Sequence, residues 1–390
     1  MIKVVVLLSR VPYPLDKGDK LRAYHQIKEL SKSYELKVIA LDDIGVKQNV
    51  IRHLQSEFDF EVIELSKIKI YFNLISGLFS SKPFQVHYFY QRSANKKIKS
   101  IIESFKPAHI YCQLIRTSEY VKNIHNIPKT IDYMDAFSKG MDRRAKDSSF
   151  FTKPFVKAEA SRLLKYENLI FDYFENKTII SEQDQSLIYH SERNDIVVVP
   201  NGVDFEFFKP RESALKEYDL VFTGNMNYPP NVNGALFLVN EILPLLIEKN
   251  PDFKLLIAGV NPTASVSALT SKNVEVSGWM DDIRDAYASA KVFIAPMRIG
   301  TGLQNKLLEA MAMDIPAVTT PLANDALNAT HKKTILVGKS KEELANFVLQ
   351  LLEDENEASQ MAKEAGDYVR SNFSWHSATE LLSNLINARK

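Results

Sequence analysis

The chain has 390 residues, enough for two or three domains, and two is the count that suits an α/β architecture. Its 49 Lys and Arg against 48 Asp and Glu give a formal net charge of +1, which disfavours nucleic-acid binding through bulk electrostatics. The single cysteine, Cys112, excludes a disulfide framework and an all-cysteine metal site.

The amino-terminal pattern predicts a cytoplasmic protein. A β-branched run starts at Ile2, so no charged region precedes a signal-peptide core. No apolar run approaches the ~20 residues that a transmembrane helix needs. Peripheral association with the inner face of the cytoplasmic membrane is compatible with both observations.

Short β-branched runs alternate with amphipathic stretches along the whole chain. In the first half we predict strands over Ile2–Leu8, Glu35–Leu41, Ala108–Cys112, Thr130–Tyr133, Thr178–Ser181 and Ile196–Val199. In the second half we predict them over Tyr218–Thr223, Lys254–Ala258, Val274–Ser277, Lys291–Ala295, Ala317–Thr319 and Thr334–Val337. This alternation predicts an α/β fold, with parallel sheets covered by helices on both faces.

A cluster of turn residues near mid-chain, Pro200–Asp204, predicts a domain boundary. We therefore expect an N-terminal domain over residues 1–200 and a C-terminal domain over 201–372, followed by a helix at 373–390 that packs back on the N-terminal domain. Two doubly wound, Rossmann-like domains in tandem predict a ligand cleft between the carboxyl ends of their sheets.

The most informative segment follows the predicted strand Lys291–Ala295. A glycine loop leads into a helix predicted over Leu303–Met313, and Gly300 and Gly302 let the backbone approach a ligand closely. The helix N-terminus carries partial positive charge, and Arg298 and Lys306 add full charges. Together these groups suit a diphosphate.

Glu309 lies three residues beyond Lys306 and therefore on the same helix face. A carboxylate that avoids the phosphates is suited to accept hydrogen bonds from sugar hydroxyls. The alternative is a surface helix pair with Lys306, worth only ~0.2–0.5 kcal/mol.

At these residues the chain resembles the retaining glycosyltransferases of the GT-B fold, family 4 (group 1). The most specific element is Gly300-x-Gly302 followed by Lys306-x-x-Glu309-Ala-Met-Ala. Further phrases occur in the family's order: Val199–Asp204, Phe222–Met226, Ala258-Gly259, Gly278–Met280 and Phe373–Trp375. The resemblance implies two Rossmann-like domains facing each other across a cleft, and a nucleotide-diphospho-sugar as donor.

The resemblance also implies roles for individual residues. Glu309 matches the second glutamate of the E-x7-E motif, which binds the nucleotide's ribose. The implied phosphate, sugar and base contacts, with the glycine turn after the second domain's first strand, are Gly18, Gly224, Asn225, Gly278, Trp279, Met280, Gly300, Thr301, Gly302 and Leu303.

The chain departs from the family pattern at two places. Thr301 stands eight residues before Glu309, so the first glutamate of the motif is missing by simple count. The usual Arg and Lys after the second domain's first strand are also absent from Gly224–Asn231. We therefore expect Arg298 and Lys306 to neutralise the diphosphate and to act in catalysis.

Asp135 follows a predicted strand of the N-terminal domain. A carboxylate there is suited to orient an acceptor hydroxyl or take its proton, or else to cap the next helix. The chain has no Asp-x-Asp motif, and its eight histidines form no close pair at ligand spacing. We therefore expect no metal or other cofactor, the nucleotide sugar being a substrate.

Aromatic and apolar residues fill the stretch Ile68–Tyr90, and Lys96, Lys97 and Lys99 follow it. Such a segment is suited to enter a lipid headgroup region and help a lipid-linked acceptor reach the site. The alternative is a helix packed on its own sheet. Single-stranded nucleic acid is the least favoured partner, because the net charge is close to zero.

The resemblance thus implies a metal-independent, retaining glycosyltransferase of the hexosyltransferase type. It would move a sugar from a nucleotide donor, such as a UDP-sugar, to a saccharide or lipid-linked acceptor in surface polysaccharide biosynthesis. Two alternatives are a nucleotide-sugar epimerase and a non-catalytic, two-lobed sugar- or nucleotide-binding protein. The pattern leaves open the base, the sugar, the acceptor and the oligomeric state.

Overall fold

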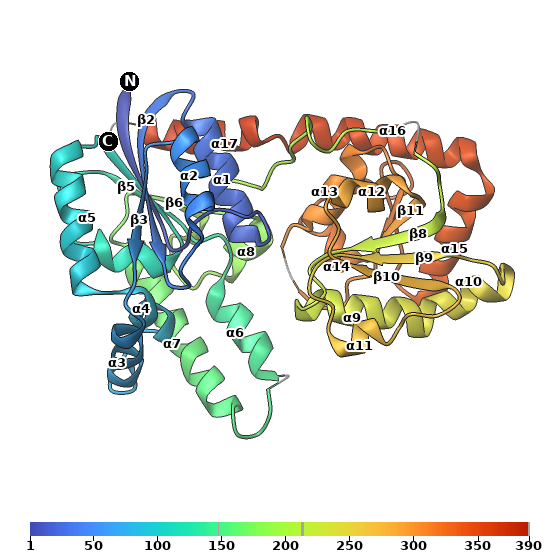
Figure 1. The fold of residues 1–390 in the computed structure, drawn as a ribbon, viewed down its shortest axis with the longest axis horizontal. Helices are drawn as coiled ribbons and strands as arrows, with labels where there is room; N and C mark the ends of the chain where they lie inside the picture. The colour runs from blue at the N-terminus through green and yellow to red at the C-terminus, as the bar shows by residue number, and fades with distance from the viewer. Residues whose placement is uncertain (147, 212–213, 301, 389–390) are drawn as a thin grey trace. The chain divides into compact units, whose positions relative to one another are not determined.

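The computed structural model describes residues 1–146, 148–211, 214–300 and 302–388 (Figure 1). The chain forms two compact units. The first comprises Met1–Pro200 and Ala378–Lys390, and the second comprises Asn201–Ser377. Each unit contains one parallel sheet with helices around it, which is the predicted α/β class.

The sheet of the first unit has the strand order β3-β2-β1-β4-β5-β6-β7. Its strands are β1 (Ile2–Leu8), β2 (Tyr34–Asp42), β3 (Phe60–Glu64), β4 (His109–Gln113), β5 (Lys129–Asp132), β6 (Asn176–Ile179) and β7 (Val197–Val198). The sequence reasoning missed β3, a short strand with exposed or half-buried glutamates at two of its five positions. The order reverses between β1 and β4, which is the switch point of a doubly wound sheet.

Helices cover both faces of this sheet. They are α1 (Gly18–Leu30), α2 (Gln48–Glu57), α3 (Lys67–Gly77), α4 (Phe84–Phe89), α5 (Arg92–Phe105), α6 (Phe137–Lys146), α7 (Lys153–Phe171) and α8 (Glu182–Leu187), with short 3-10 turns η1 (Ile115–Tyr120) and η2 (Arg193–Asp195). Successive β1 residues point to opposite faces, so Val5 and Leu7 enter one core cluster while Val4 and Val6 enter another.

The last helix, α17 (Trp375–Asn387), packs on the first unit. Its residues Leu382 and Ile386 are buried in the same core cluster as Val4 and Val6. The Tyr34 hydroxyl donates to the carbonyl oxygen of Ser383 at 3.3 Å. Residues 378–388 therefore complete a face of the first sheet.

A buried ion pair fixes α1 against the end of β5. Arg22 Nε donates to Asp132 Oδ2 at 2.6 Å, and neither side chain is exposed. The Tyr111 hydroxyl donates to the same carboxylate oxygen at 3.0 Å. Removing one partner of such a pair typically costs about 3–5 kcal/mol of stability, so Asp132 has a structural role. It lies two residues before Met134 and three before Asp135.

The sheet of the second unit has the order β10-β9-β8-β11-β12-β13. Its strands are β8 (Tyr218–Thr223), β9 (Leu255–Ala258), β10 (Val274–Gly278), β11 (Ala290–Ala295), β12 (Ala317–Thr319) and β13 (Leu336–Val337). Its helices are α9 (Pro229–Phe237), α10 (Leu243–Lys249), α11 (Ala264–Ser267), α12 (Ile283–Ala288), α13 (Asn305–Ala312), α14 (Pro321–Asn324), α15 (Lys341–Glu353) and α16 (Glu355–Asn372), with the π-helical turn η3 (Leu238–Ile242) joining α9 to α10.

One helical stretch of the described residues, Pro229–Lys249, is long and apolar enough to cross a membrane by length and composition. Half of its most apolar window is buried inside the second unit. Leu238, Ile242 and Leu246 from this stretch lie in the core of that unit. The stretch has the packing of a core helix.

Candidate functional site

The candidate site of the second unit lies where its strand order reverses. Strands β8 and β11 are neighbours there, and they lead into Gly224 and Pro296 respectively. Ligands of doubly wound sheets bind outside the carboxyl ends of the strands at such a point. Helix α13, which carries Lys306 and Glu309, follows β11.

Two glycines bring the turns after β8 and β9 into contact. A Cβ at Gly259 would lie 1.8 Å from the carbonyl oxygen of Gly224, and Gly224 itself has φ +153°. A Cβ at Gly224 would lie 2.6 Å from Asn231 Nδ2. Packing against backbone therefore requires glycine at 259, and at 224 the positive φ and the neighbouring Asn231 amide favour glycine, whatever the turn binds.

Lys306 is held in a partly buried position by a neutral partner. Its Nζ donates to Asn231 Oδ1 at 2.5 Å and lies 5.2 Å from the centroid of the Phe222 ring. Asn231 is fixed in turn, because its Nδ2 donates to the carbonyl oxygen of Asn225 at 3.0 Å. Desolvation lowers the pKa of Lys306 to about 8, with Glu309 opposing that shift. The positive charge of this ammonium is therefore not neutralised by an ion pair with a carboxylate.

Glu309 is positioned by a chain of hydroxyl groups. The Tyr287 hydroxyl donates to Glu309 Oε2 at 2.6 Å and lies 2.7 Å from Thr223 Oγ1. Because a phenol has one proton, Thr223 then donates to Tyr287. Burial raises the pKa of Glu309, and the hydrogen bond from Tyr287 opposes the rise. Among the described residues Glu309 Oε1 has no hydrogen-bond partner.

The predicted helix over Leu303–Met313 is shorter in the structure, where α13 begins at Asn305 and ends at Ala312. In the described part of the chain no side chain caps α13 at Gln304. Its first backbone amides therefore remain suited to an anion. The loop before it has Gly300 at φ +93° and Gly302 at φ +89°, a region that favours glycine.

Two further loop residues were predicted to meet the donor. Thr301 lies outside the described residues. The side chain of Leu303 is buried in the core of the second unit, so its backbone is the part suited to contact a ligand.

Arg298 has partners other than those of Lys306. Its guanidinium lies 4.1 Å from the centroid of the Phe237 ring, and its Nη1 is 3.3 Å from Glu241 Oε1. Its Nε donates to Asn233 Oδ1 at 3.2 Å. The side chain is thus held on α9 and η3, with 43% of its surface exposed.

The expected base-contact loop follows β10. Gly278 has φ +68°, and a Cβ there would meet no atom within 4 Å, so backbone conformation is what favours glycine. Trp279 is 67% exposed, and its indole nitrogen donates to Asp281 Oδ1 at 3.2 Å. Met280 packs partly against the core of the second unit. Trp279 therefore offers an open aromatic face.

In the first unit, Asp135 lies in the turn between β5 and α6 and reaches solvent. Desolvation by the surrounding atoms, then Asp184 and Glu167, raise its pKa to about 7, while Arg116 opposes the rise. Arg116 donates through Nε and Nη2 to Gln85 Oε1, at 2.9 and 2.6 Å. The described residues contain no hydrogen bond in which Asp135 caps α6.

Gly18 is the first residue of α1. A Cβ placed there meets no atom within 4 Å, so the packing of the first unit does not require glycine.

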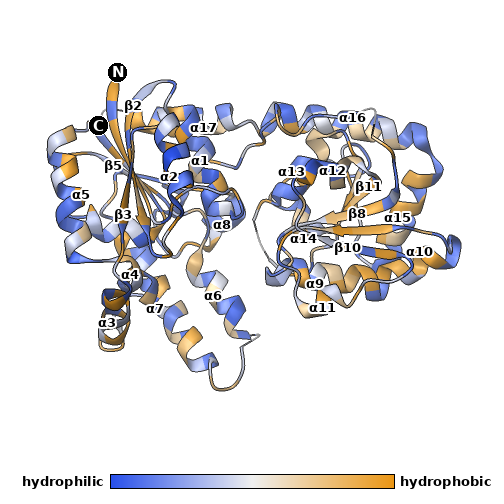
Figure 2. Cartoon of the chain, in the orientation of Figure 1, coloured by the Kyte–Doolittle hydropathy of each residue, from blue (hydrophilic) through white to orange (hydrophobic). Residues whose placement is uncertain are grey.

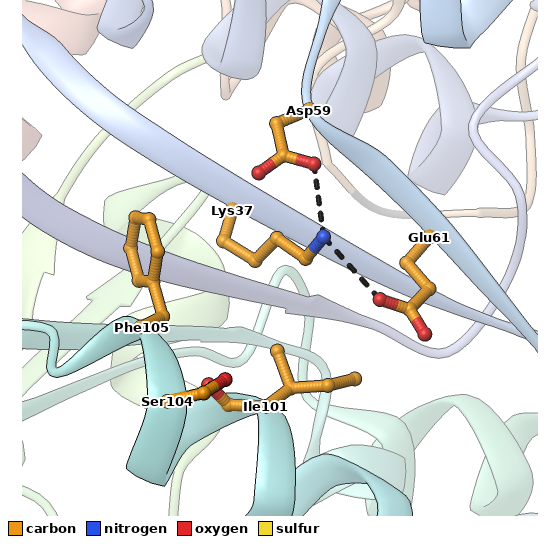
Figure 3. A pocket seen from close by; sticks show the side chains of 6 residues that line it. All are labelled: Lys37, Asp59, Glu61, Ile101, Ser104 and Phe105. Atoms are coloured by element: carbon orange, nitrogen blue, oxygen red, sulfur yellow. Dashed lines mark hydrogen bonds and ion pairs between the residues drawn. The ribbon is translucent and has the colours of Figure 1, made fainter.

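A separate hollow of about 260 Å³ lies near the amino ends of β2 and β3 (Figure 3). Lys37 projects into it and pairs with Asp59 at 2.9 Å and with Glu61 at 3.3 Å. Ile101 and Phe105 of α5 line its other side. Its charges are mutually paired and lie at the edge opposite the strand ends where ligands of such sheets bind, so it is not the candidate site.

No group of three or more His, Cys, Asp or Glu suited to hold a metal ion occurs within residues 1–146, 148–211, 214–300 and 302–388.

The sequence reasoning missed three residues that position the site: Asn231, Tyr287 and Thr223. Tyr287 lies on α12, where no motif marks it, and Thr223 ends β8 inside the phrase Phe222–Met226, to which no side-chain role was assigned at that position. Asn231 lies within the stretch noted for its missing cations. The absence of the usual Arg and Lys from that stretch was the signal that could have pointed to Asn231, because Asn231 accepts a hydrogen bond from Lys306 of α13.

Residues 217–354 match the family described as glycosyl transferases group 1. The chain is 25% identical, over 71% of its length and 74% of the relative's, to an uncharacterized 44.6 kDa protein in the cps region of Klebsiella pneumoniae. It is also 25% identical, over 49% of its length, to a GDP-mannose-dependent monoacylated alpha-(1-6)-phosphatidylinositol monomannoside mannosyltransferase of Corynebacterium glutamicum. The chain spans 55% of that mannosyltransferase.

Solved structures share the fold over the whole chain. TarM of S. aureus matches with a TM-score of 0.74 at 13% identity, covering 100% of this chain and 99% of TarM. Anabaena HepE in complex with UDP and glucose matches with a TM-score of 0.70 at 13% identity, covering 100% of both chains. Sucrose-phosphate synthase from Thermosynechococcus elongatus matches with a TM-score of 0.70 at 14% identity, covering 98% of both chains.

The fold is therefore GT-B, and the protein is a glycosyltransferase. Its second unit carries a glycosyl transferases group 1 domain, the family that the sequence resembles. The matches give no support to the epimerase and binding-protein alternatives.

The burial of Lys306 predicts a pH-dependent cost in stability. Its pKa is about 8 in the folded chain, below the ordinary value of 10.5. The cost of burying the charge is therefore fully present below pH 8 and fades as pH rises towards 10.5. Lys306→Met does not bear this cost. Its free energy of unfolding minus that of wild type should therefore fall by about 1–3 kcal/mol between pH 7 and pH 10, as measured by urea unfolding.

The matched control for that experiment is Lys249→Met, an exposed lysine that ends α10. The same pH dependence in both variants would show that Lys306 is not desolvated.

Proposed function

We propose that the second unit binds the diphosphate of a nucleotide-diphospho-sugar between Lys306 and the amides that begin α13. The observation that carries the proposal is the Lys306 ammonium, partly desolvated and held by the neutral amide of Asn231. An anionic ligand would compensate that desolvation. Negative charge grows on the outer phosphate as the sugar leaves, so the same groups would stabilise the transition state.

The other donor contacts that the second unit supplies in this proposal surround the same strand ends. Glu309 accepts hydrogen bonds from ribose hydroxyls through Oε1, while Tyr287 holds Oε2. The exposed ring of Trp279 stacks on the base, with Gly278 and Met280 shaping that loop. In the first unit, the free space around Gly18 lets a phosphate approach the start of α1.

The relatives support the substrate class without fixing the base. The mannosyltransferase of C. glutamicum uses GDP-mannose, whereas HepE was solved with UDP and TarM with UDP and alpha-GlcNAc-glycerol. We infer a nucleotide-sugar donor with a saccharide or lipid-linked acceptor, used in surface polysaccharide synthesis. Transfer with retention and without a metal or other cofactor is part of the proposal, and a cytoplasmic location stays a prediction.

Replacing the donor contacts tests their roles. Lys306→Met should weaken affinity for UDP or GDP at least about tenfold and lower turnover by about 10²–10³, because a fixed charge on the leaving group is lost. Glu309→Gln should weaken nucleotide affinity less. Arg298→Gln should lower turnover by a smaller factor than Lys306→Met, since this guanidinium must first leave Glu241.

The control for these binding and rate measurements is Lys291→Met, near the opposite end of β11 from the site. Unchanged affinity and turnover in Lys306→Met would remove the diphosphate assignment.

The stereochemistry and metal requirement have their own test. The donor for this test is the nucleotide sugar that raises the melting temperature of the protein most. The coupling constant of the anomeric proton in the product should show that the anomeric configuration is the same as in the donor. Turnover should be unchanged by EDTA. An inverted product, or activity lost in EDTA and restored by Mg²⁺, would contradict the proposed mechanism.

Two shifted groups predict a bell-shaped pH profile of kcat/KM. If Asp135 takes the acceptor's proton, activity rises as its carboxyl ionises near pH 7. If the Lys306 ammonium binds the diphosphate, activity falls as it deprotonates near pH 8. Asp135→Asn should remove the acidic limb, and Lys306→Arg should shift the basic limb upward because arginine stays charged. Profiles identical to wild type would exclude both assignments.

A further inference from the structure

Helix α3 has two apolar faces, and the first unit covers only one of them. Ile70 and Gly77 are buried and Leu74 is partly buried against the core. The opposite face consists of Ile68, Tyr71, Phe72 and Ile75, spaced three and four residues apart, and these side chains are 58–69% exposed. We call these four residues the outer face of α3. In Figure 2 this helix has orange segments that alternate with blue and pale ones.

A second set of exposed aromatic residues lies at the start of α7. Phe150 and Phe151 are 85% and 84% exposed, and Phe155 is 64% exposed. We call these three residues the phenylalanine turn. In Figure 1, α3 and the first turns of α7 lie at the same end of the first unit.

A direct contact holds α3 beside α7. Arg162 of α7 donates through Nη1 to the carbonyl oxygen of Gly77 at 2.8 Å, and its guanidinium lies 4.6 Å from the centroid of the Phe84 ring. Phe155 precedes Arg162 by seven residues, about 10 Å along the helix. The two sets of exposed side chains therefore belong to neighbouring elements.

The sequence segments that carry these residues have a strong excess of Lys and Arg, in a chain whose net charge is only +1. No Asp or Glu occurs between Leu65 and Ile102, and residues 139–165 contain eight Lys and Arg against three Asp and Glu. One of those three, Glu159, is buried and accepts hydrogen bonds from the backbone of Phe84 and Gln85. Exposed aromatic residues among exposed cations match a surface of anionic lipids.

We propose that the outer face of α3 and the phenylalanine turn dock the protein peripherally on a membrane containing anionic lipids. Aromatic and aliphatic side chains would enter the headgroup region while the lysines contact lipid phosphates. A two-fold dimer through this surface is less compatible, because it would place the cations of one copy against the same cations of the other. The surface does not depend on the proposed donor site, but within the proposed function it favours a lipid-linked acceptor.

Vesicle sedimentation of the full chain, without donor, tests the proposal. The protein should sediment with vesicles of equimolar phosphatidylcholine and phosphatidylglycerol, and less with phosphatidylcholine alone or at high salt. The double variants Tyr71→Ser/Phe72→Ser and Phe150→Ser/Phe151→Ser should each bind about tenfold more weakly or worse. These side chains are already exposed, so the fold should be preserved, as circular dichroism would check.

The matched control is Ile44→Ser/Tyr189→Ser, which removes two exposed apolar side chains from elsewhere in the first unit, 66% and 67% exposed. If the control variant binds vesicles as strongly as wild type does, the proposal is supported. Absence of wild-type binding, or equal binding by the Tyr71→Ser/Phe72→Ser variant, overturns it. So does a concentration-dependent dimer in sedimentation velocity that this variant abolishes, because the surface would then join two copies.

Lys306→Met separates this proposal from the proposed function. A variant that loses donor affinity but still binds vesicles shows that docking stands alone. Failure of docking with intact donor binding would overturn only the membrane surface.

Discussion

The proposed donor site depends on one desolvated charge that the protein leaves without a carboxylate partner. Lys306 Nζ lies against the Phe222 ring and donates to the amide oxygen of Asn231, so its charge is oriented but not neutralised. A carboxylate in that place would compete with a phosphate for the same ammonium. The neutral amide fixes the geometry and leaves the electrostatic attraction available to a ligand.

Much of the surrounding backbone serves to place that amide. Asn231 is held through the carbonyl of Asn225, and the turn containing Asn225 lies against Gly259 at a distance that only glycine permits. Glu309 is on the same helix as Lys306 but is held by Tyr287 instead. One helix thus presents a cation with a neutral anchor and a carboxylate with a hydroxyl anchor, which suits a ligand with an anionic part and a hydroxyl-bearing part.

Local sequence predicted the strands and the helix of the site because their signals are continuous along the chain. Parallel strands buried on both faces are uninterrupted β-branched runs, whereas β3, with polar residues among its five, gave no such signal. Lys306 and Glu309 were predicted to act together because a glycine loop and helical spacing join them. Asn231 and Tyr287 reach them from α9 and α12 only through the fold of the sheet, so no spacing in the sequence marks that contact.

Arg298 and α3 illustrate the same limit in a different way. Charge and position beside the loop favoured Arg298 as a diphosphate ligand, but its choice of partners depends on the ring of Phe237 and the carboxylate of Glu241, which α9 and η3 bring to it. In α3 the apolar pattern fits packing on the core and contact with lipid equally well, and the structure shows one face packed on the core of the first unit and the other face exposed. Aromatic residues on the outer face of α3 are exposed to water, so they do not contribute to the free energy of folding through burial. Their presence on α3 therefore requires an explanation other than folding. The excess of Lys and Arg in the same segments favours an anionic lipid surface as the partner of these aromatic residues.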